Sequence, residues 1–141
     1  MRLTRQTLAV AAAFAAVGCG PPPGPATDHR ALSTTYSFRV TADPVPPFAR
    51  ERTEYKVVVR DRDSGQPIEG GQGRIFASNR GGASTWDGLV TGKELGTYYA
   101  RLNFVTAGEW AIAIQFRSDS TKPLERVDWM QDVRNERQEI P

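Results

Sequence analysis

The sequence has few of the residues on which disulfide and metal chemistry depend. It contains one cysteine, one histidine and two methionines among 141 residues. A single cysteine excludes an internal disulfide, and so few imidazole and thioether groups leave little for a soft-metal site. The sequence also lacks a large excess of either charge, because it contains 18 lysines and arginines and 16 aspartates and glutamates. This balance excludes the strongly basic surface typical of nucleic-acid binding, so we expect no nucleic-acid partner.

The sequence also lacks an apolar run long enough to span a bilayer. The uncharged apolar segment at residues 8–17 is shorter than the ~20 residues of a transmembrane helix. Arg2 and Arg5 precede it, and the small residues of Ala16-Val17-Gly18 lead directly to Cys19. This order is typical of a bacterial lipoprotein signal peptide, although leucine is more usual than alanine at the position of Ala16. We predict a signal peptide at residues 1–18 and lipid attachment at Cys19.

Two alternatives are an ordinary secretory cleavage with an incidental cysteine, and an anchor that is not cleaved. Cleavage before Cys19 would remove Arg2 and Arg5, leaving basic residues equal in number to the 16 acidic ones. Attachment to the membrane would then depend on the acyl chains of Cys19 and not on a basic surface. Gly20, the residue after the cysteine, favours the outer membrane. The predicted location is therefore the bacterial cell envelope, at the periplasmic face of the outer membrane or at the cell surface.

The rest of the chain divides into a tether, a β domain and a tail. Residues 19–34 are rich in proline and glycine and predict an extended tether, in which we expect His29 to be solvated. Residues 135–141 form a polar tail. Between them, apolar and polar side chains alternate, which indicates half-buried strands. The strands we expect are residues 35–41, 54–60, 74–78, 86–90, 96–105 and 110–117, with residues 107–109 as a tight hairpin turn.

Residues 124–137 fit two structures. Leu124, Val127, Met130 and Val133 follow a helical period, whereas Val127, Trp129 and Val133 follow a strand. We favour a strand, because it would cover an edge of residues 110–117. Those residues also place Ala111 and Ala113 outward, which indicates a covered or central strand. Six to seven short strands predict an all-β fold, an immunoglobulin-like antiparallel β-sandwich over residues 35–134.

No constellation of residues predicts catalysis. Acylation of Cys19 and the position of His29 in the tether leave no nucleophile with a histidine base. The paired carboxylates Asp61 and Asp63 fall in a turn, where we expect them to be solvated. We therefore predict a protein that is not an enzyme and that has no cofactor or metal site.

The candidate binding residues lie in and after a glycine-rich loop. Loops at the end of a sandwich often carry binding sites, and tryptophan and arginine are frequent anchors of protein interfaces. The candidate residues for binding another envelope protein are Asn79, Arg80, Trp86 and Asp87. An alternative is a carbohydrate-binding module in which Trp86, Trp129 or Tyr99 forms a stacking platform.

The order of motifs between residues 43 and 116 resembles the YtkA-like domain family, which is related to FixH-like domains. The matching motifs are DRDSGQP at residues 61–67, GTYYA at 96–100 and AGEW at 107–110. The resemblance implies a small sandwich domain of the bacterial envelope and, as in some members, a role in handling copper. This sequence departs from such members at residues 75–84, because IFASNRGGAS contains neither methionine nor histidine.

Overall fold

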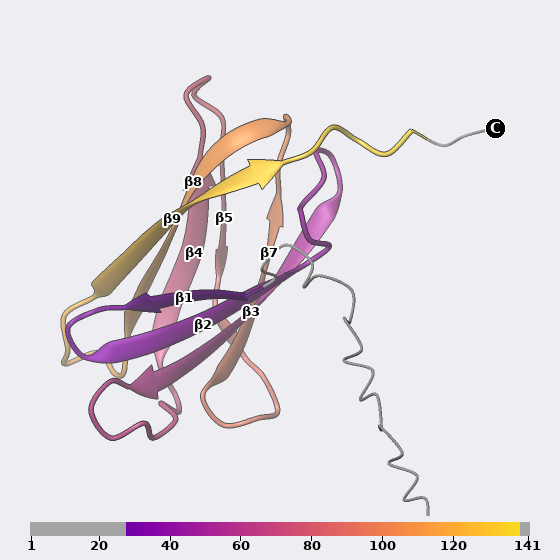
Figure 1. Ribbon diagram of the computed structural model, residues 1–141. Helices are drawn as coiled ribbons and strands as arrows, with labels where there is room; N and C mark the ends of the chain where they lie inside the picture. The colour runs from indigo at the N-terminus through magenta and orange to yellow at the C-terminus, as the bar shows by residue number, and fades with distance from the viewer. Residues whose placement is uncertain (1–27, 139–141) are drawn as a thin grey trace, which may run out of the picture.

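The computed structural model describes residues 28–138, which form two antiparallel β-sheets packed face to face (Figure 1). Sheet 1 has the order β1 (Asp28–Leu32), β2 (Tyr36–Asp43), β3 (Arg52–Asp61), β7 (Thr97–Asn103) and β6 (Val90–Thr91). Sheet 2 has the order β5 (Ser84–Gly88), β4 (Gln72–Ser78), β8 (Gly108–Arg117) and β9 (Glu125–Val133). Within these residues, no helix is long and apolar enough to cross a membrane.

The strand order confirms the predicted immunoglobulin-like sandwich. Strands β2, β3, β7 and β6 lie in the order of the A, B, E and D strands of that fold, and β4, β8 and β9 lie in the order of C, F and G. The seven predicted strands are all present. Two short strands that the sequence did not predict, β1 and β6, lie at the two edges of sheet 1.

The predicted hairpin at residues 107–109 is wrong. Strands β7 and β8 belong to different sheets, so the chain between them crosses from one sheet to the other. Phe104 and Trp110 meet edge to face across this connection, with ring centroids 5.1 Å apart. The indole Nε1 of Trp110 donates a hydrogen bond of 3.0 Å to the carbonyl of Thr106. Alternation showed which side chains are buried, but burial alone does not say which strand is the hydrogen-bonded neighbour.

Strand β9 confirms the interpretation of residues 124–137 as a strand. It pairs with β8 in antiparallel register from Gly108↔Val133 to Phe116↔Glu125. Strand β8 therefore lies between β4 and β9, as the outward Ala111 and Ala113 indicated.

The predicted tether extends too far. Its last part forms β1, which pairs with β2 from Asp28↔Thr41 to Leu32↔Ser37. The ring of His29 is not free in solution but stacks on Trp129, with centroids 4.8 Å apart. Five residues with only two apolar side chains gave too short an alternation to predict a strand. The signal peptide, Cys19 and residues 19–27 of the tether lie outside the described residues.

The stacking of His29 gives the fold a pH dependence. Partial burial lowers the pKa of the imidazole, and the neighbouring Asp28 carboxylate opposes this effect. Neutral His29 contributes its full stabilisation above the unfolded-state pKa of 6.5. This stabilisation is lost as the pH falls through the lower pKa of the folded state, because protonated His29 is less favourable in the folded protein. We expect the free energy of unfolding to fall as the pH drops below 6.5 and through the lower folded-state pKa of His29, as measured by urea titration. Since His29 is the only histidine, His29→Gln should remove this fall, and an unchanged pH profile would contradict the assignment.

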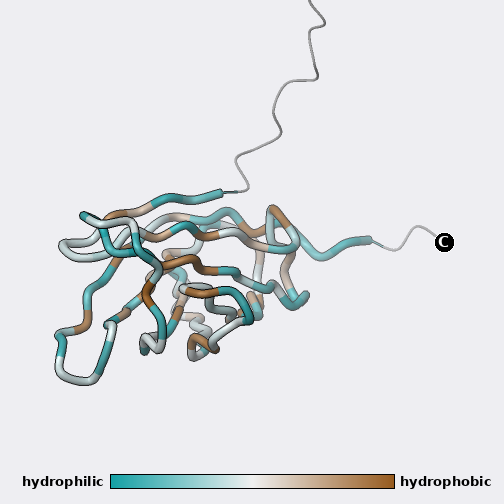
Figure 2. The backbone as a smooth tube through the Cα atoms, turned by 90° about the horizontal axis from the view of Figure 1, so that it is seen from below, coloured by the Kyte–Doolittle hydropathy of each residue, from teal (hydrophilic) through white to brown (hydrophobic). Residues whose placement is uncertain are grey.

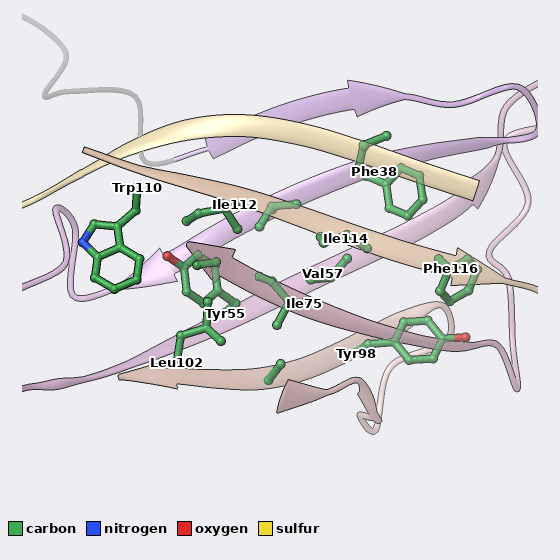
Figure 3. Packing of buried hydrophobic residues seen from close by; sticks show 14 of the residues in the cluster. Phe38, Tyr55, Val57, Ile75, Tyr98, Leu102, Trp110, Ile112, Ile114 and Phe116 are labelled. Carbon is green, nitrogen blue, oxygen red and sulfur yellow. The ribbon is translucent and has the colours of Figure 1, made fainter. Parts of the chain in front are cut away.

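The core lies between the sheets and confirms the predicted inward faces. Hydrophobic and hydrophilic residues alternate along the strands (Figure 2), and Figure 3 shows buried side chains from both sheets meeting in one cluster. Tyr98 also binds the backbone, because its hydroxyl donates to the carbonyl of Ile68 at 2.7 Å and accepts from the amide of Gly71 at 2.9 Å. A Cβ at Gly71 would overlap the ring of Phe116, so this close approach requires glycine.

Candidate functional site

The four residues predicted to bind a partner do not form one site. Asn79 stabilises its own loop: its Oδ1 accepts from the amide of Ala83 at 3.0 Å, and its Nδ2 donates to Thr106 Oγ1 at 3.1 Å. Asp87 points toward sheet 1, where its carboxylate accepts from the amide of Arg101 at 2.8 Å. Both side chains therefore have structural roles, which leaves Arg80 and Trp86 to face solvent.

Trp86 lies on the outward face of sheet 2, within a group of apolar side chains that we call the Trp86 face. The group follows from the register of the four strands, in which Trp86 is opposite Phe76, Phe76 is opposite Ala113, and Ala111 is opposite Met130. Trp86 is 68% exposed and Met130 is 56% exposed. The Trp86 face consists of Phe76, Trp86, Ala111 and Met130, whereas Ala113 has the same orientation but is only 2% exposed.

Two arginines border the Trp86 face. The guanidinium carbons of Arg74 and Arg126 lie 5.2 and 5.0 Å from the ring centroid of Phe76, within the range of cation–π attraction. Arg126 is held in place by Asp128, to which its Nε and Nη2 donate at 2.9 and 2.6 Å. The result is an aromatic surface with cations at its side and no deep cavity.

A shallow hollow adjoins the Trp86 face at the end of the sandwich. It measures about 550 Å³, and it is lined by the β4–β5 loop together with Glu109, Ala111 and Met130. Arg80, in that loop, lies at its rim. The hollow therefore connects the predicted loop with the Trp86 face: Asn79 and Arg80 both line it, whereas Asp87 does not.

The three aromatic residues considered for a sugar platform lie in different places. Trp129 is half-buried against His29 between the sheet edges. Tyr99 is half-buried on the outward face of sheet 1, opposite Lys56 and Val90. Only Trp86 presents most of its ring to solvent. Across residues 28–138, no group of three or more histidine, cysteine, aspartate or glutamate side chains is placed to hold a metal ion.

The sequence did not identify Phe76 and Met130 as part of the site. Phe76 precedes the inward Ala77 and follows the inward Ile75, so its outward position could have been read from the alternation. The sequence does not define the face on which Met130 lies, because residues 124–137 fit both a helix and a strand.

Comparison with known proteins defines the fold alone. No family model matches the sequence, and no curated protein matches it. Among solved structures, the fold is similar to that of a DUF4426 family protein from Pseudomonas aeruginosa, with a TM-score of 0.60 and 10% sequence identity. The match covers 79% of this chain and 98% of the other. The fold and the similar structure together place the chain among small all-β sandwich proteins.

Proposed function

We propose that the protein is a non-catalytic, lipid-anchored component of the bacterial cell envelope whose sandwich binds another envelope protein. The observation that carries this proposal is the Trp86 face. A tryptophan that is 68% exposed lies opposite Phe76, and the guanidinium groups of Arg74 and Arg126 lie within 5.2 Å of the Phe76 ring centroid. Tryptophan and arginine contribute disproportionately to binding energy at interfaces, and contiguous exposed apolar surface marks interaction sites.

The lipid anchor is proposed from the N-terminal sequence. Arg2 and Arg5, the apolar residues 8–17 and the small residues before Cys19 follow the order of a lipoprotein signal. Cys19 is nine residues before the first strand, so an acylated Cys19 would hold the sandwich close to a membrane. A domain held in this way can act as an accessory to a neighbouring envelope protein without chemistry of its own.

Metal handling, which the resemblance to YtkA-like domains suggests, has less support. Copper sites generally combine two or more imidazole or thioether ligands. His29 stacks between the sheet edges on Trp129, whereas Met130 points to the outward face of sheet 2. These two side chains therefore do not converge. The resemblance does support a small accessory domain in the envelope.

Carbohydrate binding also has less support than protein binding. A sugar platform combines an aromatic ring with several polar groups that fix the hydroxyls. The outward neighbours of Trp86 are Ser84 and Gly88 on its own strand and Phe76 across the sheet. Ser84 is the one polar side chain among these three neighbours, so few groups beside the ring could fix sugar hydroxyls, and the site suits a protein partner better.

The test is photo-crosslinking in intact cells with a photoreactive amino acid in place of Trp86. We expect a discrete adduct with one envelope protein. The control places the same amino acid at Gln66, an exposed residue in the turn between β3 and β4, where no such adduct should form. Identical adducts at both positions, or none at position 86, would contradict the proposal.

With the partner identified, Trp86→Ala should weaken binding by about 30-fold, since truncation of a central tryptophan commonly costs about 2 kcal/mol or more. The matched control is Leu124→Ala, which removes a side chain that is 50% exposed in the connection between β8 and β9. Leu124→Ala should leave the dissociation constant unchanged in titration calorimetry. Equal effects of the two substitutions would show that Trp86 has no special role.

A further inference from the structure

The outward face of sheet 1, on the opposite side of the sandwich from the Trp86 face, gathers basic side chains from three strands. Arg30 of β1 lies opposite Arg39 of β2, and Arg39 lies opposite Val58 of β3. Lys56 and Arg60 lie two residues to either side of Val58 and point the same way. We call Arg30, Arg39, Lys56 and Arg60 the basic face; together they line a shallow hollow of about 590 Å³.

The acidic residues beside the basic face do not neutralise it. One oxygen of Asp28 forms ion pairs with two arginines, because it lies 2.8 Å from Arg39 Nε and 3.8 Å from Arg30 Nη2. Glu94 lies 3.9 Å from Lys56 Nζ. Like charges directly opposite each other on neighbouring strands are destabilising, and Arg30 and Arg39 form such a pair. Four cations against two carboxylates leave an excess of positive charge, which would be relieved by an anionic ligand.

Two exposed leucines border the same hollow. Leu32 of β1 is 61% exposed, and Leu95, in the connection between β6 and β7, is 62% exposed. Surfaces that lie on membranes combine basic residues, which attract anionic headgroups, with apolar side chains that enter the headgroup region. The basic face with its leucines has both features.

The position of β1 suggests that the anionic ligand of the basic face is the surface of a membrane. This step rests on the proposed lipid anchor at Cys19. Asp28 is nine positions after Cys19, so β1 would lie within about 30 Å of the acylated cysteine. A tether this short keeps a face built partly from β1 at a high effective concentration next to the bilayer.

We propose that the basic face docks on the anionic phospholipid surface of the membrane that holds Cys19, with Leu32 and Leu95 entering the headgroup region. The Trp86 face, on the other side of the sandwich, then points away from the membrane. Membrane attachment therefore has an electrostatic component besides the acyl chains, and docking orients the surface that binds the partner.

The test uses residues 19–141 with Cys19→Ser, so that no acyl chain contributes. The protein is floated with vesicles of phosphatidylcholine alone and with vesicles containing about 30 mol% phosphatidylglycerol. We expect binding to the anionic vesicles alone, weakened when salt is raised from about 0.05 M to about 0.3 M. Because basic and acidic residues are equal in number over this range, such binding reports the local charge of one face.

Substitutions show which face binds. Arg30→Gln with Arg60→Gln should lower the partition coefficient by about 25-fold, at about fivefold for each charge near the surface. Arg74→Gln with Arg126→Gln makes the same change of net charge on sheet 2 and should have little effect. Equal losses in the two double variants, or equal binding to neutral and anionic vesicles, would overturn the proposal. Circular dichroism checks that both double variants remain folded.

One further double variant distinguishes docking on a membrane from binding to an acidic protein. Leu32→Ser with Leu95→Ser should weaken vesicle binding about tenfold or more through the loss of inserted apolar side chains. Unchanged vesicle binding by this variant, together with equally tight binding of polyglutamate, would overturn the proposal in favour of an acidic protein. Acylation of Cys19 is measured separately on the native protein, so failure of the docking surface and failure of the lipid anchor give different results.

Discussion

Replacement of Phe116 with alanine is expected to reduce the free energy of unfolding by about 4 kcal/mol. Phe116 is fully buried on β8. Its ring meets those of Tyr36, Phe38 and Tyr98 edge on, with centroids 5.1, 6.0 and 5.3 Å away. Truncation would remove the apolar area that Phe116 buries and leave a cavity among three large rings, which cannot close it without moving two strands.

The matched control is Phe76→Ala, the same change in the neighbouring strand but on the outward face of sheet 2. Phe76 is half-buried and contacts Arg74 and Arg126 from the solvent side, so its loss should cost about 1 kcal/mol. Both values come from urea denaturation monitored by circular dichroism. Equal costs for the two substitutions would show that the inward and outward faces of sheet 2 are assigned wrongly.

Replacement of Cys19 with serine should abolish lipid labelling completely. In the proposed modification the Cys19 thiol would accept diacylglycerol, and the sequence contains no other cysteine to replace it. Cells that express the protein and are fed an alkyne analogue of palmitate should label the wild-type chain and not the variant. Two acyl chains suffice for stable membrane attachment, so loss of the label removes the predicted anchor.

The control for this experiment is Ala16→Leu, which introduces the residue more usual at that position before the cysteine. It should be labelled at least as strongly as the wild type. Equal labelling of Cys19→Ser and the wild type would mean that lipid is attached elsewhere or not through this signal.

Local alternation predicted the composition of the core well. Tyr98, Ala100, Leu102 and Phe104 are inward and buried, as their spacing indicated. Alternation did not predict strand partners. The sequence of β7 shows the same alternation of buried and exposed residues whether the next strand lies in the same sheet or in the opposite one. The crossing between β7 and β8 depends on contacts such as Trp110 with Thr106, which the sequence shows only as two residues near each other.

The candidate site was predicted only in part. The exposed position of Trp86 agrees with a binding role, but Asn79 and Asp87 make hydrogen bonds with Thr106 and Arg101. These partners are distant in sequence, so residue type alone could not separate a structural side chain from an available one. The basic face could not be predicted for the same reason, because its residues are distant in sequence. A near-neutral total charge says nothing about charges that the sheet brings together from three strands.

The intact mass of the protein shows whether Cys19 carries the proposed lipid anchor. The protein would be extracted with detergent from cell envelopes and measured by mass spectrometry, with fragmentation from the N-terminus. We expect a chain that begins at Cys19 and carries the added mass of acyl groups on that residue. A chain with an unmodified Cys19, or one that begins at another residue, would contradict the proposed anchor.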